Sequence, residues 1–91
     1  MTFTMPAKDP DEVLDYQLDW TARLDGDTIS SSSAVLEEGD ATIDSQSYVS
    51  AVHTVWLSGG TAGTVTIVTL RIVTAGGRTM DESIKVKIKE R

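Results

Sequence analysis

The stretch LDYQLDW at positions 14–20 decides the fold class, because its apolar side chains stand at every second position. Leu14, Tyr16, Leu18 and Trp20 alternate there with polar residues. In an extended strand successive side chains point to opposite faces, so this spacing puts one face on an apolar core and the other in water. The pattern predicts a first β-strand.

The far end of the chain repeats this alternation. In SIKVKIK, positions 83–89, Ile84, Val86 and Ile88 alternate with three lysines. We expect the lysines to face solvent and the apolar residues to face inward. The two ends of the chain therefore predict strands that share one interior.

Between these two segments, short β-branched runs are separated by turn signals rich in Gly and Asp. We expect strands at 28–35, 41–43, 49–57 and 64–74, turns at 25–27, 37–40, 59–63 and 76–77, and a polar break at 44–47. The serine run 30–33 is typical of an edge strand, although it also fits a linker. The run 64–74 is apolar or threonine on both faces except at Arg71, which indicates a central strand.

Six or seven short strands without a helical stripe predict an all-β fold, either a sandwich or a small barrel. We favour an immunoglobulin-like antiparallel β-sandwich. Ninety-one residues suit one domain, and we expect an extended N-terminal arm over 1–12 and a single sandwich domain over 13–91. Trp20 and Trp56 are expected to fill the core, because large rings on patterned strands usually pack inside.

Composition and charge narrow the classes of partner. The chain has no cysteine, which leaves no disulfide and no thiolate metal site. Its apolar runs are far shorter than the roughly 20 residues of a spanning helix, so we expect no membrane partner. Eleven of the fourteen acidic residues lie in 1–45, whereas six of the eight basic residues lie in 46–91. Because an acidic half repels phosphate, we expect no nucleic acid partner either.

Catalytic and ligand-binding patterns are weak. His53 is the single histidine and no serine lies in a nucleophile elbow, so we expect no enzyme and no catalytic residues. The acidic turns 25–27 and 37–40 lack the ligand spacing of a calcium loop, so no metal site is expected. The glycine run 59–63 lacks the lysine and following helix of a phosphate-binding loop, so no cofactor is expected.

Four stretches carry a resemblance to a known family: KDPDEVLDY at 8–16, DW at 19–20, VWLSGGTAG at 55–63 and TAGGRT at 74–79. Together they resemble the phage fiber-tail adaptor proteins, over nearly the whole chain from residue 8 onward. The resemblance implies an immunoglobulin-like β fold, no enzymatic activity and a place in the virion. Its implied partners are other phage structural proteins, namely tail, connector and fibers, with several copies in each particle.

The resemblance and the charge distribution together indicate a candidate protein interface. It comprises Lys8, Asp9, Pro10, Asp11, Arg71, Arg78, Lys85, Lys87 and Lys89. The alternative function is an immunoglobulin-like capsid decoration or a host-surface recognition module that binds through loops 59–63 and 76–77. Those loops contain none of the aromatic residues that stack on glycans, which favours the adaptor.

The opposite charges of the two halves suggest a mode of assembly. Copies could pack head to tail in a ring, with the acidic half of one against the lysine strand of the next. The lysines at 85, 87 and 89 fit equally well a charged sheet edge that blocks uncontrolled strand addition.

Overall fold

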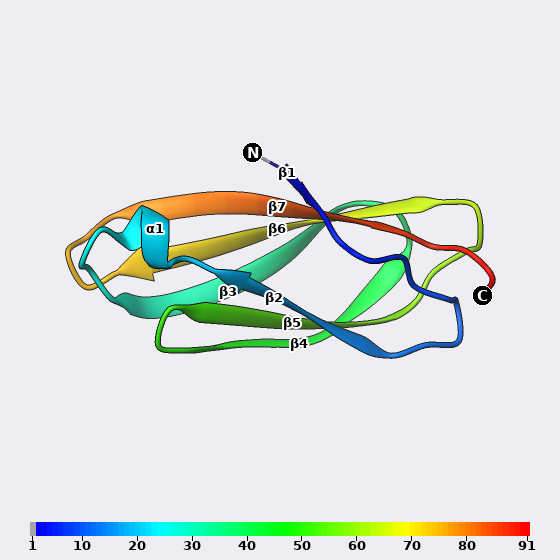
Figure 1. Cartoon of the computed structure of the whole chain (residues 1–91), viewed down its shortest axis with the longest axis horizontal. Helices are drawn as coiled ribbons and strands as arrows, with labels where there is room; N and C mark the ends of the chain where they lie inside the picture. Colours follow the sequence, from blue (N-terminus) through cyan, green and yellow to red (C-terminus); the bar gives the residue numbers. More distant parts are fainter. Residues whose placement is uncertain (1) are drawn as a thin grey trace.

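Seven strands in two sheets and one short helix form the regular structure of the computed structural model, which describes residues 2–91. Figure 1 shows the strands lying along the long axis of the molecule. The elements are β1 (Thr2–Thr4), β2 (Leu14–Asp19), α1 (Thr21–Leu24), β3 (Ile29–Glu38), β4 (Ala41–Val49), β5 (Val52–Gly59), β6 (Val65–Thr74) and β7 (Thr79–Lys87).

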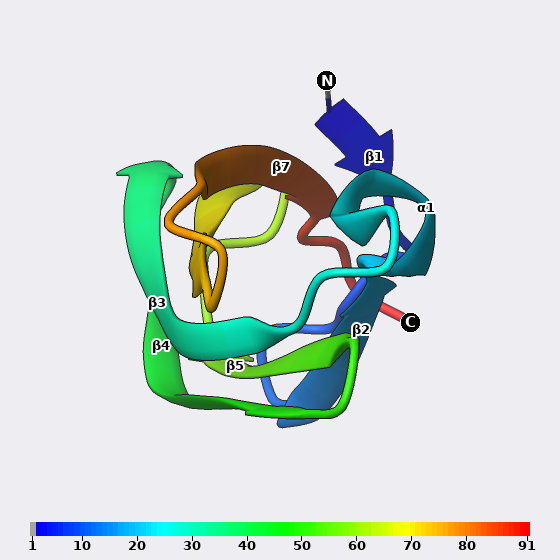
Figure 2. The same cartoon turned by 90° about the vertical axis from the view of Figure 1, so that its left-hand side faces the viewer.

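The strands form a four-stranded sheet in the order β1-β7-β6-β3 and a three-stranded sheet in the order β2-β5-β4. Neighbouring strands are antiparallel except β1 and β7, which are parallel. Figure 2 looks at one end of the molecule, with β3 and β4 at one side of the sandwich and α1 and β1 at the other. The predicted all-β fold is confirmed.

The core forms where the inward faces of the two sheets meet, because alternation buries every second side chain. Along β2 and just after it, Tyr16, Leu18 and Trp20 are buried. The two long strands β6 and β7 contribute a matching row: Val68, Leu70, Ile72, Ile84 and Val86. The segments at 14–20 and 83–89 therefore share one interior, as their patterns predict.

Two further expectations about the sheets are confirmed. The serine-rich strand β3 lies at an edge of its sheet, and β6 lies in the middle between β3 and β7. The lysine strand β7 is not a free edge over its whole length, because β1 pairs with it at residues 83–85.

The expectation that Trp56 fills the core is wrong. Trp56 is 41 % exposed, whereas Trp20 is 1 % exposed. The reason is alternation on β5, where the neighbours Val55 and Leu57 are both fully buried. Their inward direction forces Trp56 onto the outer face.

The expected boundaries between 41 and 57 are also wrong. Residues 44–47 are not a break, because β4 continues through them with a bulge between Ile43 and Ser45. The predicted strand 49–57 is interrupted by a turn at Ser50. Ser50 has a positive φ of 54°, although it is not a glycine. Asp44, Ser45 and Ser47 are exposed to solvent, and Gln46 hydrogen-bonds with Ser32 of the opposite sheet, so β4 accommodates these polar side chains.

The N-terminal segment lies along the outer side of β7. Residues 2–4 pair with residues 83–85, and Lys8 forms an isolated parallel bridge with Ile88. The division into an arm over 1–12 and a domain over 13–91 stays a prediction. Within residues 2–91, the helix is too short to cross a membrane.

Candidate protein interface

The single histidine lies in the core. His53 is fully buried on β5, and its Nε2 lies 2.8 Å from Oε1 of Gln46 on β4. The same Gln46 oxygen accepts a hydrogen bond of 2.7 Å from the Ser32 hydroxyl on β3. Burial disfavours the imidazolium form and lowers the pKa of His53 from its ordinary value. His53 therefore belongs to a polar link between the two sheets.

Lys8, a predicted interface residue, is fully buried. Its Nζ donates to the backbone carbonyls of Asp9, at 2.8 Å, and of Gly59, at 2.6 Å. Its backbone N–H donates to the carbonyl of Lys87, and its carbonyl accepts from the N–H of Lys89, both at 2.9 Å. Lys8 thus ties the N-terminal segment to the end of β5 and to the end of β7 with the residues that follow it.

The next residues form a turn that holds the C-terminus. The Asp9 carboxylate accepts hydrogen bonds from the backbone N–H groups of Asp11, at 2.8 Å, and Arg91, at 2.9 Å, and these bonds lower its pKa. The Glu12 carboxylate accepts from the Asp9 N–H at 2.8 Å. Pro10 is half-buried, and Asp11 is exposed at the tip. We call residues 8–12, 59–63 and 88–91 the clasp.

The clasp brings together two of the stretches that carry the family resemblance, 8–16 and 55–63. Besides the bond from Lys8, the Gly63 N–H donates to the Ile88 carbonyl at 2.8 Å. Gly60 has a φ of 100°, and a Cβ there would lie 3.0 Å from the Ile88 side chain. Glycine meets both demands. These motif residues therefore determine how one end of the sandwich is closed.

Arg78 lies at the opposite end, beside α1. Its guanidinium donates to the Leu24 carbonyl and to the Asp27 carboxylate, the latter at 3.3 Å. Asp27 also accepts from the Gly76 N–H at 3.1 Å. Hydrogen bonds, first from the Thr74 side chain, lower the pKa of Asp27 to about 2. Arg78 therefore fastens the β6–β7 turn to the segment after α1.

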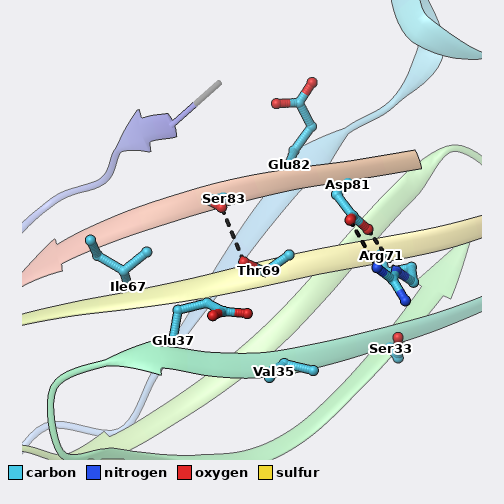
Figure 3. Close-up of a pocket in the computed structure, with 9 residues that line it drawn as sticks. All are labelled: Ser33, Val35, Glu37, Ile67, Thr69, Arg71, Asp81, Glu82 and Ser83. Carbon is cyan, nitrogen blue, oxygen red and sulfur yellow. Dashed lines mark hydrogen bonds and ion pairs between the residues drawn. The ribbon is translucent and has the colours of Figure 1, made fainter.

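Arg71 lies in a groove on the outer face of the four-stranded sheet (Figure 3). Its guanidinium holds the Asp81 carboxylate through two hydrogen bonds, of 2.7 and 3.0 Å. The Thr69 and Ser83 hydroxyls lie 3.1 Å apart in the next row. The groove has a volume of about 560 Å³ and is lined by Ser33, Val35, Glu37, Ile67, Thr69, Arg71, Asp81, Glu82 and Ser83.

The three C-terminal lysines follow the same side of β7. Lys85 is half-buried opposite Ile67, and Lys87 is exposed opposite Val65. Lys89 is exposed beyond the end of the strand. The nine predicted residues thus occupy three places: the clasp, the β6–β7 turn, and the outer face of β6 and β7 with its C-terminal extension.

Sequence reasoning missed Trp56 as a surface residue. It stands on the central strand of the three-stranded sheet, directly opposite Asp15 on β2 and Ser45 on β4. Parity was the available signal, because Val55 and Leu57 are the more apolar neighbours on a strand of alternating faces. Tryptophan is one of the side chain types enriched among the residues that contribute most to binding in protein interfaces.

Comparison with known protein families gives a match over most of the chain. The family described as podophage GP4 fiber-tail adaptor protein gp77 matches residues 8–87. The matched range includes the clasp residues up to Gly63, the groove and both tryptophans. No curated protein sequence matches the chain significantly.

The solved structures include a similar fold. The solution structure of the PKD domain from KIAA 1837 protein superposes with a TM-score of 0.55 and 23 % sequence identity. The match covers 96 % of this chain and 83 % of that domain. A PKD domain is immunoglobulin-like, so the predicted immunoglobulin-like β-sandwich is confirmed. At this identity the likeness concerns the fold alone.

Proposed function

Because this chain belongs to the podophage GP4 fiber-tail adaptor family, we propose that it is a virion component that joins the phage tail to its fibers by protein contacts alone. The family supports the coarser role of a structural adaptor in the tail. The proposal adds that tail and fiber proteins bind this chain directly, that several copies occupy each particle, and that the chain catalyses no reaction.

The family match over residues 8–87 is the observation that carries the proposal. The geometry supports it through the clasp, because an adaptor has to keep its shape while neighbours pull on it. Lys8 bonds to the carbonyls of two separate segments, and the Asp9 carboxylate fixes the backbone of Arg91. Both ends of the chain are thereby fastened to the sandwich.

Six of the nine predicted interface residues have one of two roles under this proposal. Lys8 and Asp9 preserve the shape of the clasp, since their polar groups bond within the chain. The exposed side chains Asp11, Arg71, Lys87 and Lys89 contact neighbouring proteins. Charges of this kind mainly set the orientation and the rate of association.

The test is reconstitution from purified components. The chain is mixed with the tail and fiber proteins of its phage, and complexes are identified by size-exclusion chromatography with light scattering. We expect a stable complex that contains all three, and no fiber–tail complex when the chain is omitted. The triple variant K85E, K87E, K89E should slow association, with the effect decreasing as salt is raised.

A control variant and a rejecting outcome complete the test. S31E is a control on β3, because it adds a negative charge at an exposed position away from β7. Binding of the chain to a glycan array, together with no binding to any tail or fiber protein, would reject the adaptor in favour of host recognition.

A further inference from the structure

The outer face of the three-stranded sheet is acidic around one exposed tryptophan. Trp56 stands at its centre, and the exposed residues Asp15, Asp19 and Asp44 lie on the same three strands. Asp15 is directly opposite Trp56, and Asp44 accepts a hydrogen bond of 3.0 Å from Ser58, two residues along β5. We call this surface the Trp56 face.

The Trp56 face has no cation of its own. Strands β2, β4 and β5 contain no lysine or arginine over their described lengths. Exposure of a large apolar ring to water is unfavourable, and burying it against a partner is favourable. Because carboxylates lie near this ring, the most favourable partner both covers the ring and supplies cations. The occupant is therefore expected to combine an apolar groove with lysine or arginine.

The outer face of the four-stranded sheet has exposed apolar side chains in a groove and lysines next to that groove. In the groove of the four-stranded sheet, Val35 is 53 % exposed and lies beside Thr69, with Ile67 one row further along (Figure 3). Lys85 and Lys87 continue from Ile67 along β7. No ion pair is found for these two lysines among residues 2–91.

The size of the groove suits an indole ring. Pockets of roughly 300–1,000 Å³ accommodate a drug-sized ligand, and the groove measures about 560 Å³. Two apolar residues, Val35 and Ile67, lie in the groove between Glu37 at one end and the Arg71–Asp81 pair at the other, and the remaining lining residues are polar. A ring that enters between them covers Val35 and leaves the lysines free for carboxylates.

We infer that Trp56 of one copy docks into the groove of a second copy, with Asp15 and Asp44 of the first approaching Lys85 and Lys87 of the second. The two surfaces lie on the outer faces of different sheets, so one copy can use both at once. Such a contact is heterologous and builds a ring or an open row of copies. The inference rests on the proposed adaptor function only in supposing that several copies meet at the tail.

A pair of variants tests the contact. W56K places a charge on the Trp56 face and leaves the groove intact, whereas T69K blocks the groove and leaves the Trp56 face intact. We expect sedimentation velocity over a concentration series to show self-association of the wild type. For each variant alone, we expect the dissociation constant for self-association to be about tenfold higher or more. Mixing the two should restore association, but only to a heterodimer of one W56K and one T69K chain.

Two control variants test whether an added positive charge alone reduces association, wherever it is placed. A62K adds the same charge at an exposed residue of the loop between β5 and β6, off the Trp56 face, and T79K adds it on β7 outside the groove. Both should associate as the wild type does. If T69K fails to give a native circular dichroism spectrum, V35K replaces it, since Val35 is an exposed part of the same groove.

The outcomes separate this inference from the proposed function. A wild type that stays monomeric at every concentration, alone and in complex with tail and fiber proteins, overturns the inference and leaves the adaptor function intact. Variants that associate as well as the wild type, or a mixture that gives no heterodimer, also overturn it. A chain that self-associates through Trp56 yet binds no tail or fiber protein contradicts the proposed function alone.

Discussion

Trp20 and Trp56 are the same residue in two different regions of one small sandwich. Trp20 ends the alternating stretch of β2 and is 1 % exposed, with the Arg23 guanidinium 5.8 Å from its ring centre. Trp56 stands in the middle of β5 and is 41 % exposed. The difference teaches that strand parity, and not residue type, decides which side chain builds the fold and which is left for a partner.

The largest expected effect comes from removing each ring in turn. We expect W20A to lower the free energy of unfolding by about 3–5 kcal/mol, because it leaves a cavity in the core. W56A should change it by less than about 1 kcal/mol, because a surface ring loses few contacts. Urea denaturation followed by circular dichroism measures both. Equal losses for the two variants would contradict the assignment of core and surface.

The lysines give a second pair of identical residues in different surroundings. Lys8→Met keeps most of the side-chain volume but leaves the carbonyls of Asp9 and Gly59 without their donor. We expect a loss of about 1–3 kcal/mol in the free energy of unfolding. Lys89→Met, at an exposed position, should stay within about 0.5 kcal/mol of the wild type. The same urea denaturation experiments measure both changes. If Lys8→Met leaves the free energy of unfolding unchanged, the clasp does not stabilise the fold.

His53 extends the comparison along β5, because it faces inward three residues before Trp56. Its pKa is lowered in the folded state by burial, so the unfolded chain binds a proton more readily. The stability that depends on neutral His53 is fully present above its unfolded pKa of about 6.5 and is lost as pH falls toward the folded pKa. Unfolding free energies between about pH 7 and pH 5 should therefore decrease in the wild type.

The variant His53→Gln isolates this effect. It removes the titrating group from the core, so its unfolding free energy should vary less over the same pH range. If the slope stays as steep as in the wild type, other groups cause it.

The fold was largely predictable because its two best patterned segments, 14–20 and 83–89, lie in strands that face one core. The turn at Ser50 was not, since neither glycine nor proline marks it. The pairing of β1 with β7 joins residues about eighty positions apart, and three-residue strands carry no periodic signal of their own.

The candidate site was predictable only in part. Arg71, Lys87 and Lys89 are exposed as their patterns suggest, but nothing local indicates that Lys8 is buried. Its burial depends on the carbonyl of Gly59, a contact between distant segments. Trp56 lies at the surface because the parity of β5 outweighs the general preference of tryptophan for interiors.

A density map of the intact phage particle tests the central claim most directly, because it shows which side of the sandwich each neighbour covers. We predict several copies between tail and fibers, with the ring of Trp56 buried against another chain and that of Trp20 in the same core as in the free protein. Copies found away from the tail, or Trp56 rings that face only solvent, would contradict this account.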